Sequence, residues 1–297
     1  MRTASPYYRR MLAIQSAGEK TLNKKLAAAI AGKDDSAWRE FEDGLRRAIF
    51  ISMLAGVASA RVLDPSRLHR PGHVRSHYAD DAMFKISPFE RAVRFMTSRA
   101  SIPDRRVEEL SLLARKRAFW ITGVTKMETV ELFKRRIADL AAGKSVPVSE
   151  FVRAAKAISD SHAETVLRTN LSRAFNQAHV DEVAGEMGEF VALLRLDEVH
   201  DNRTRGNPNG LYPNPDRPHW QMDGYLAAPR DPVWSIITPP NGYNCRASTT
   251  AITWDTAERM GLLSGKRTLN HSRIRSKNGI RQKLIDSGVY PDPGFGI

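Results

Sequence analysis

The change in residue pattern near position 187 constrains the fold of this chain more than any other feature. Before it, apolar residues recur at a spacing near 3.6 among good helix formers, which is typical of amphipathic helices. After it, the stretch from Leu196 to Thr249 mixes charged and amide side chains with Gly, Pro and Trp and has little helical period. Amphipathic packing does not account for such a stretch. The sequence therefore predicts either a polar site or a small, tightly hydrogen-bonded structural module there.

The N-terminal part is predicted to consist of helices joined by one connector rich in Pro, Gly and Arg. Asp34 or Asp35 can cap the second helix, and Ser161 and Glu164 have the spacing of a capping box for the last one. In that last helix Phe175 lies on the apolar face, whereas Asn176 is expected on the opposite, polar face. Helical patterns extend over residues 7–31, 34–62, 88–99, 103–119, 126–142, 147–158 and 161–188.

The C-terminal part is predicted to contain short strands between turn-rich loops. A loop rich in Pro, Gly and Asn is expected over 202–218, and a brief helix over 256–262. The fold class is therefore α+β, with a mostly helical N-terminal region followed by a small C-terminal module with short antiparallel strands. The candidate strands are 190–196, 219–226, 233–238 and 246–253. The expected domains are 1–63 (N-terminal helices), 64–86 (connector), 87–187 (helical region), 188–263 (the α+β module) and 264–297 (a basic, partly irregular tail).

The charge balance favours a polyanionic partner. The chain has 46 Lys and Arg residues against 33 Asp and Glu, a formal net charge of +13. Such self-repulsion is tolerated more easily beside DNA or RNA, and a basic but inert surface is the alternative. No acidic residue lies between Glu258 and Asp286. The candidate nucleic-acid-binding residues in this interval are Lys266, Arg267, Arg273, Arg275, Lys277, Arg281 and Lys283.

Cysteine content and hydropathy exclude two classes of protein. Cys245 is the only cysteine, so no intramolecular disulfide can form, which fits a reducing compartment. No run of about 18 apolar residues is present, so we expect no membrane-spanning helix and no membrane partner. The N-terminus lacks the apolar segment and cleavage site of a signal peptide.

Several side chains of the Leu196–Thr249 stretch have the chemistry of metal ligands or catalysts. Cys245 beside Arg246 could act as a nucleophile with His219 as its base, although a lone Cys is more often a small buried residue. A metal-dependent hydrolase or nuclease using His200, Asp201, His219 and Asp223 is therefore the alternative function. The spacing of these residues is not that of a zinc finger, and a single Cys cannot form a thiolate-rich site, so no metal is expected. No cofactor and no catalytic residue are expected either. The only metal-ligand candidates retained are His200, His219, Asp223 and Cys245.

The structural interpretation assigns the same side chains to a network that stiffens the module. Asp201 and Arg203 would share one strand face and pair, and Arg246 could reach back to Asp201 or Asp223 as a bidentate partner. Asp223-Gly224 has the sequence of a hairpin turn. Trp220 and Trp234 are expected to cover a small core. The residues assigned to the structural motif are Asp201, Arg203, Thr204, His219, Asp223, Gly224, Pro240, Asn244, Cys245 and Arg246.

Taken in order, a set of motifs resembles a known family. The set begins with Glu164, Thr165, Arg168-Thr169-Asn170 and Arg173-Ala174-Phe175, and continues with Asp201-x-Arg203-Thr204, His219, Asp223-Gly224 and Pro239-Pro240-x-Gly242-Tyr243-Asn244-Cys245-Arg246. It is similar to the minor head protein family of tailed bacteriophages, the head morphogenesis proteins typified by the phage Mu F protein. The resemblance covers about residues 160–253.

The resemblance implies a structural and assembly role without a catalytic reaction. It implies a low-copy virion component at the capsid interior or portal vertex, which is in the host cytoplasm during assembly. The implied partners are the portal protein, major capsid or scaffold proteins, and packaged double-stranded DNA. Family members often carry a Cys after the Arg-Thr pair and another after Cys-Arg, but Arg205 and Ala247 stand there in this chain. A metal-binding role is therefore not carried over. A free DNA-binding protein is a further alternative.

Overall fold

A computed structural model of the chain describes residues 24–26, 28–29, 36–61, 93, 97, 100–118, 121, 165, 169–214, 216–243, 245–293 and 295. The expected helices over 126–142 and 147–158, the connector 64–86 and the capping box at Ser161 and Glu164 lie outside these residues, as does Asn244. So do most residues of the helices expected over 7–31 and 88–99. Among the described residues, no helix has the length and apolarity needed to cross a bilayer.

The chain divides into two compact units, 1–52 with 104–171 and 53–103 with 172–297. The expected domain boundaries after residues 63, 86 and 187 remain predictions. Both α2 (Ser36–Arg61) and the helix that includes residues 169–184 contribute residues to each of the two units. In the first unit, residues 36–52 of α2 and 104–118 are helical, as predicted, and bury apolar side chains such as Leu45 and Leu110.

A three-stranded antiparallel sheet forms the centre of the second unit. Its strand order is β2-β1-β3, with β1 at Val191–Asp197, β2 at Leu226–Ala227 and β3 at Ser248–Thr253. A bulge near Ala192 breaks the alternation of β1, since Val191 pairs with Thr253 and Leu193 with Ile252. The bulge lets Ala192 and Leu193 both contribute to one core cluster, whereas Leu194 contributes to the other. The α+β class is thus confirmed.

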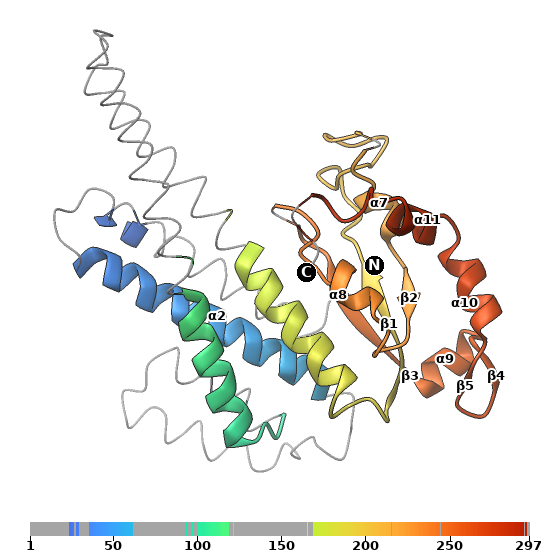
Figure 1. Cartoon of the computed structure of the whole chain (residues 1–297), viewed down its shortest axis with the longest axis horizontal. Helices are drawn as coiled ribbons and strands as arrows, with labels where there is room; N and C mark the ends of the chain where they lie inside the picture. Colours follow the sequence, from blue (N-terminus) through green and yellow to red (C-terminus); the bar gives the residue numbers. More distant parts are fainter. Residues whose placement is uncertain are drawn as a thin grey trace, which may run out of the picture. The chain divides into compact units, whose positions relative to one another are not determined.

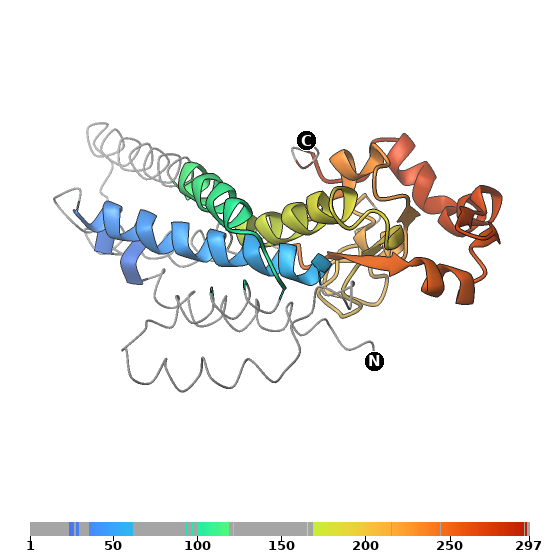
Figure 2. The same ribbon diagram turned by 90° about the horizontal axis from the view of Figure 1, so that it is seen from below.

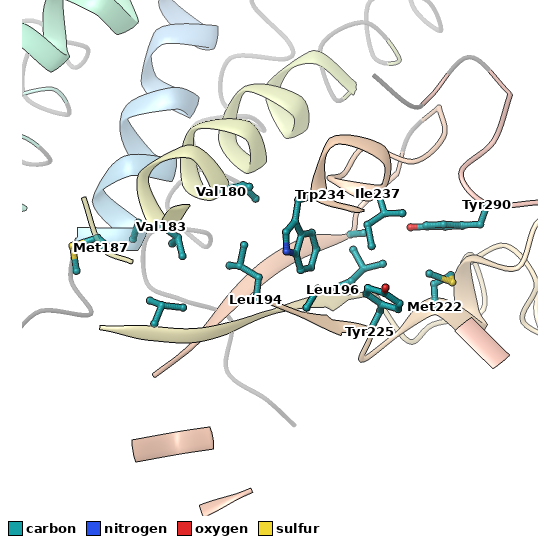
Figure 3. Packing of buried hydrophobic residues seen from close by; sticks show 14 residues of the cluster. Val180, Val183, Met187, Leu194, Leu196, Met222, Tyr225, Trp234, Ile237 and Tyr290 are labelled. Carbon is teal, nitrogen blue, oxygen red and sulfur yellow. The ribbon is translucent and has the colours of Figure 1, made fainter. Parts of the chain in front are cut away.

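Helices cover the sheet with two apolar clusters. The helix over 169–184 and α8 (Val233–Ile237) contribute Val180, Val183, Trp234 and Ile237, which pack with Leu194 of β1 (Figure 3). The second cluster joins β1 and β2 to α9 (Trp254–Arg259) and α10 (His271–Asn278). Its members are Ala192, Leu193, Leu226, Ile252, Ala257, Leu262 and Ile274. Burial of these side chains is the main source of stability for the unit.

The second half of α2 crosses the helix over 169–184 at close range (Figure 2). A Cβ at Gly56 would lie 2.2 Å from the carbonyl oxygen of Phe175 and 3.1 Å from the amide nitrogen of His179. Only a glycine at this position allows the two backbones to approach so closely. Nearby, the buried Arg61 guanidinium contacts the buried Glu182 carboxylate at 2.6 Å and donates to the Ser101 carbonyl.

Two of the four expected strands are confirmed and two are wrong. The strands expected over 190–196 and 246–253 are β1 and β3. Residues 219–226 instead form a single helical turn, α7 (His219–Met222), with only Leu226 belonging to a strand, and 233–238 forms α8. Both helices begin directly after a proline, Pro218 and Pro232. A proline has no N–H to donate to a neighbouring strand, so it favours the start of a helix over a β-strand at these positions.

Residues 264–297, expected as a basic and partly irregular tail, pack on the module. They contain the end of β4 (Leu263–Gly265), β5 (Thr268–Leu269), α10 and α11 (Ile280–Asp286) (Figure 1). Beyond α11 the chain returns to the core, where Tyr290 is only 1% exposed and Asp292 and Phe295 are also buried. The packing therefore shows no break at residue 263.

Candidate functional site

Asp201 and Arg246 join the two ends of the polar stretch, and Asp201 is one of the two partners, with Asp223, that the sequence offered for Arg246. Both terminal guanidinium nitrogens of Arg246 donate to the Asp201 carboxylate, one of them at 2.7 Å. The same carboxylate accepts from the Arg203 backbone N–H at 2.9 Å and from the Thr204 hydroxyl at 3.2 Å. The hydrogen bonds from Arg246 hold the pKa of Asp201 well below its usual range. The expected pairing of the Arg203 side chain with Asp201 is not seen, because residues 201–204 form turns and not a strand.

His219 lies between two carboxylates from distant parts of the chain. Its Nε2 is 3.3 Å from Asp292 and its Nδ1 is 3.6 Å from Glu198, and all three side chains are nearly inaccessible to solvent. Burial alone would lower the pKa of His219, but hydrogen bonds with Asp292, Cys245 and Glu198 outweigh it and raise the pKa to about 11. The imidazole is therefore positively charged at neutral pH.

The Asp292 carboxylate contacts three cationic groups. Its carboxylate bonds to Arg205 and Arg217 in addition to His219, the contact with Arg217 measuring 3.0 Å. Burial opposes ionisation of Asp292, yet the hydrogen bond to His219 and the three positive charges lower its pKa. A Cβ at Gly242 would lie 2.4 Å from the Asp292 carboxylate, so this carboxylate packs directly on the Gly242 backbone. Asp292 also donates its backbone N–H to the Asn241 carbonyl.

These ion pairs form one side of a cavity of about 490 Å³. The cavity lies between the loop after β1 and the segment before β3. Its lining combines arginines with aromatic and hydrogen-bonding side chains. The lining residues are Glu198, Val199, Arg203, Thr204, Arg205, Tyr212, Pro213, Asn214, Arg217, His219, Tyr243, Cys245 and Arg246. We refer to it as the arginine cavity.

The Asp223-Gly224 turn has a structural role, although it is not the two-residue hairpin that the sequence indicated. Gly224 has a φ of +83° and donates its N–H to the Leu196 carbonyl at 2.7 Å. Asp223 accepts from the Glu198 backbone N–H at 3.0 Å and pairs with His200 at 3.1 Å. The long loop between β1 and β2 therefore ends at Gly224. The His200 ring also packs against Trp220, which is half-buried, while Trp234 enters the core as expected.

The four residues of the alternative hydrolase do not share one set of partners. His200 pairs with Asp223, Asp201 with Arg246, and His219 with Asp292 and Glu198. A different group, Glu198, His219 and Cys245, brings possible ligand atoms within 4.8 Å of one another. His219 also bonds to Asp292, so both of its ring nitrogens have carboxylate partners within the chain.

The candidate nucleic-acid-binding residues divide into two groups. Arg273 donates to the Gly261 carbonyl, and Arg281 donates to the carbonyls of Asp223 and Lys277, so both guanidiniums bond to the fold. The other five side chains are exposed on the β4–β5 turn, α10 and α11. These are Lys266, Arg267, Arg275, Lys277 and Lys283, which we call the basic face.

Several important residues were not singled out from the sequence. Glu198, Arg217 and Asp292 have no sequence motif of their own, and Asp292 is in a Pro- and Gly-rich end that reads as irregular. Asn176, expected on a polar helix face, is 1% exposed and bonds to β3. A buried partner is the only signal that distinguishes such an Asn from a surface one, and it is visible only in three dimensions. Of the remaining motif residues, Pro240 is buried and follows a cis peptide bond.

Comparison with known proteins identifies one family. Residues 120–250 match the family model described as Phage Mu protein F like protein. This range contains every residue that lines the arginine cavity, but not Asp292. Searches among curated proteins and among solved structures gave no significant match. The resemblance to phage head morphogenesis proteins is therefore confirmed, and residues 120–250 of this chain are similar to the phage Mu protein F like family.

Proposed function

We propose that the chain is a structural and assembly component of a tailed bacteriophage head, a minor head protein that associates with the portal. The observation that carries this proposal is the family match over residues 120–250. The arrangement of the polar residues supports it, because the charged side chains of the site hold its loops together. Asp201, His219 and Asp292 each bond to groups of this chain, and none is left as a poised base.

The geometry supports a rigid docking module over a catalytic one. The Asp201–Arg246 pair joins the loop after β1 to the segment before β3, and Asp292 attaches the C-terminal segment to the same loops. Residues far apart in the sequence are thereby fixed without a disulfide or a metal. Such a module can present a constant surface during head assembly, where several copies of other proteins meet around it.

The basic face is the proposed contact with packaged DNA. Five exposed cations, none of them paired with an acidic side chain in the described part of the chain, lie within residues 266–283 and supply sequence-independent phosphate contacts. Arg273 and Arg281 contribute by fixing α10 and α11 to the module. We expect the chain to bind double-stranded DNA without sequence preference, with an affinity that falls steeply as salt increases.

Binding to the portal protein encoded in the same phage or prophage genome tests the first part of the proposal. We expect the purified chain to form a complex with that portal protein in analytical ultracentrifugation, and particles assembled without the chain to lack it at the portal vertex. If the chain and the portal protein sediment independently under assembly conditions, portal association is wrong.

Titration of double-stranded DNA tests the second part. A variant with Lys266, Arg267, Lys277 and Lys283 changed to Ala should lose most of the affinity and show a shallower dependence on salt. Arg203→Ala, which removes one exposed cation of the arginine cavity, is the matched control and should leave DNA binding nearly unchanged. Equal losses in both variants would mean that DNA contacts are not concentrated on the basic face.

A further inference from the structure

We propose that the arginine cavity receives the acidic side chains of a peptide segment from another protein of the phage head. This inference rests on the proposed function, because it supplies a recognition site for a head protein. It assigns to the cavity a ligand of defined chemistry, one or two carboxylates with an adjacent aromatic group. The cavity lies within one compact unit of the chain, so its walls are fixed relative to one another.

The side chains around the cavity carry an excess of positive charge, which favours an acidic ligand. Four guanidinium groups and the His219 imidazolium line it, whereas in the described part of the chain three carboxylates pair with these cations: Glu198, Asp201 and Asp292. Two positive charges therefore exceed the local negative ones. Arg203 is exposed, and no carboxylate partner of its guanidinium is found in the described part of the chain. Arg217 keeps 47% of its side chain exposed beside Asp292.

The chain itself shows how these arginines recognise an acidic segment. Residues 290–293 and 295 run through the site, and the Asp292 carboxylate is held by Arg205, Arg217 and His219. Three positions later, the Phe295 ring packs edge-on against Tyr243, with ring centroids 4.9 Å apart. One wall of the cavity thus binds an aspartate followed by an aromatic residue. Arg203, which lines the cavity and does not contact Asp292, offers a further guanidinium donor for an incoming carboxylate.

The size and rim of the cavity favour a peptide over DNA. A volume of about 490 Å³ accommodates a few side chains but excludes an intact double helix. Two tyrosines at the rim are largely exposed, Tyr212 by 56% and Tyr243 by 62%. Tyr and Arg are the residue types most enriched where proteins bind one another tightly. A single nucleic-acid strand is the competing occupant, because its phosphates and bases have related chemistry.

Selection from a displayed library of random hexapeptides tests the inference without assuming a partner sequence. The full-length chain is the target, and the matched targets are Arg203→Ala and the control Lys116→Ala, an exposed cation of the helix over 104–118 that belongs neither to the cavity nor to the basic face. Wild type and Lys116→Ala should both enrich peptides rich in Asp and Glu with an aromatic neighbour. Arg203→Ala should lose that enrichment. The selected peptide, titrated against the full chain, should bind at least about tenfold more weakly to Arg203→Ala, and its Asn/Gln counterpart should not bind.

Three outcomes would overturn the proposal. The first is an absence of acidic enrichment with wild type, and the second is enrichment that survives Arg203→Ala or is lost with Lys116→Ala. The third is displacement of the selected peptide by oligothymidine with a stronger affinity than the peptide itself, which would assign the cavity to single-stranded nucleic acid. Failure here is distinguishable from failure of the proposed function, because the portal complex and the DNA titration do not use the library.

Discussion

Asn176 and Asn278 bond to opposite edges of the same three-stranded sheet. Asn278 of α10 accepts from the Leu226 N–H at 2.9 Å and donates to the Leu226 carbonyl at 2.8 Å, on β2. Asn176 accepts from the Thr249 N–H at 3.0 Å and donates to the Ala247 carbonyl at 3.4 Å, at the start of β3. Because β2 and β3 are the outer strands, the two amides satisfy backbone groups that a further strand would otherwise bond.

Replacing either asparagine should destabilise the module and expose one edge of the sheet. Asn176→Ala leaves the buried Thr249 N–H without its partner, and Asn278→Ala does the same to Leu226, at a cost of about 1–3 kcal/mol each. Amide hydrogen exchange checks the location of the effect. The Thr249 amide should exchange faster only in Asn176→Ala, and the Leu226 amide only in Asn278→Ala.

The control for this pair is Gln177→Ala, which removes an exposed side-chain amide next to Asn176. This amide donates to the Asp181 carboxylate one helical turn away. It should change the free energy of unfolding by less than about 0.5 kcal/mol. If the two asparagine variants behave like this control, their bonds to the strand edges do not contribute to stability.

The two asparagines also show what the sequence could and could not predict. The helix over 169–184 and the strands β1 and β3 follow from apolar periodicity, since the same spacing that buries Phe175 defines the helix. A polar residue between apolar positions reads as solvent-facing, and Asn176 was placed there. Its burial depends on β3 lying beside the helix, a long-range contact that no local pattern encodes.

Gly56→Ala should be strongly destabilising because α2 crosses the helix over 169–184 at this residue. The added Cβ would lie 2.2 Å from the Phe175 carbonyl oxygen, so the two backbones must move apart. We expect a loss of about 2–4 kcal/mol, despite the better intrinsic helix propensity of Ala. Thermal or denaturant unfolding measures it.

Gly188→Ala is the matched glycine substitution for that experiment. Its Cβ would meet only ordinary contacts at 3.5 Å. It should stay within about 1 kcal/mol of wild type. An equal loss in both variants would contradict the assignment of a special close approach to Gly56.

Disruption of the Asp201–Arg246 pair should cost less than a fully buried ion pair. A buried pair that loses one partner typically costs about 3–5 kcal/mol, but here the side chains are 35% and 30% exposed. We expect about 1 kcal/mol for Arg246→Ala. Asp201→Ala should cost about 2 kcal/mol, because it also removes the bonds from Arg203 N–H and the Thr204 hydroxyl.

A double-mutant cycle isolates the ion pair from these loop bonds. The coupling energy between Asp201→Ala and Arg246→Ala should be about 1 kcal/mol. Arg203→Ala serves as the control, since its exposed side chain lies outside the pair, and should be nearly neutral. A coupling energy near zero would show that the contact is not maintained in solution.

The polar site was predictable in its composition but only partly in its pairing. A bond from Arg246 back to Asp201 or Asp223 followed from complementary charge at both ends of a Pro- and Gly-rich stretch, but the choice of Asp201 did not. The partners of His219 did not follow, because Asp292 is 73 positions away in a segment without periodicity. That segment is ordered by Tyr290 in the core and by three cations around one carboxylate, both of which are tertiary effects.

His179 should make the module less stable as the pH falls from 6.5 to 4. Burial lowers the pKa of His179 from 6.5 to about 4, while the unfolded chain binds the proton near 6.5. The contribution of the neutral His179 imidazole to the free energy of unfolding is therefore fully present above pH 6.5. It is lost as the pH falls, by up to about 3 kcal/mol at pH 4. Denaturant unfolding of wild type and His179→Leu measures it. The variant should lose this slope, whereas His271→Gln, which changes an exposed histidine, should keep it.

His219 should have the opposite effect, so that the free energy of unfolding decreases as the pH rises above 6.5. Its pKa is raised to about 11 by Asp292, Cys245 and Glu198 against the effect of burial, so the folded chain keeps a proton that the unfolded chain releases near 6.5. The stabilisation is fully present below pH 6.5 and declines by at most about 1.4 kcal/mol per pH unit above it. Below pH 10 the two buried tyrosines with raised pKa values, Tyr225 and Tyr290, add nothing to this decline.

The variant His219→Gln should therefore be less stable than wild type at pH 6.5, but its free energy of unfolding should stay nearly constant up to pH 10. His271→Gln should follow the wild-type slope. A wild-type slope retained in His219→Gln would mean that this imidazole is not held protonated between Glu198 and Asp292.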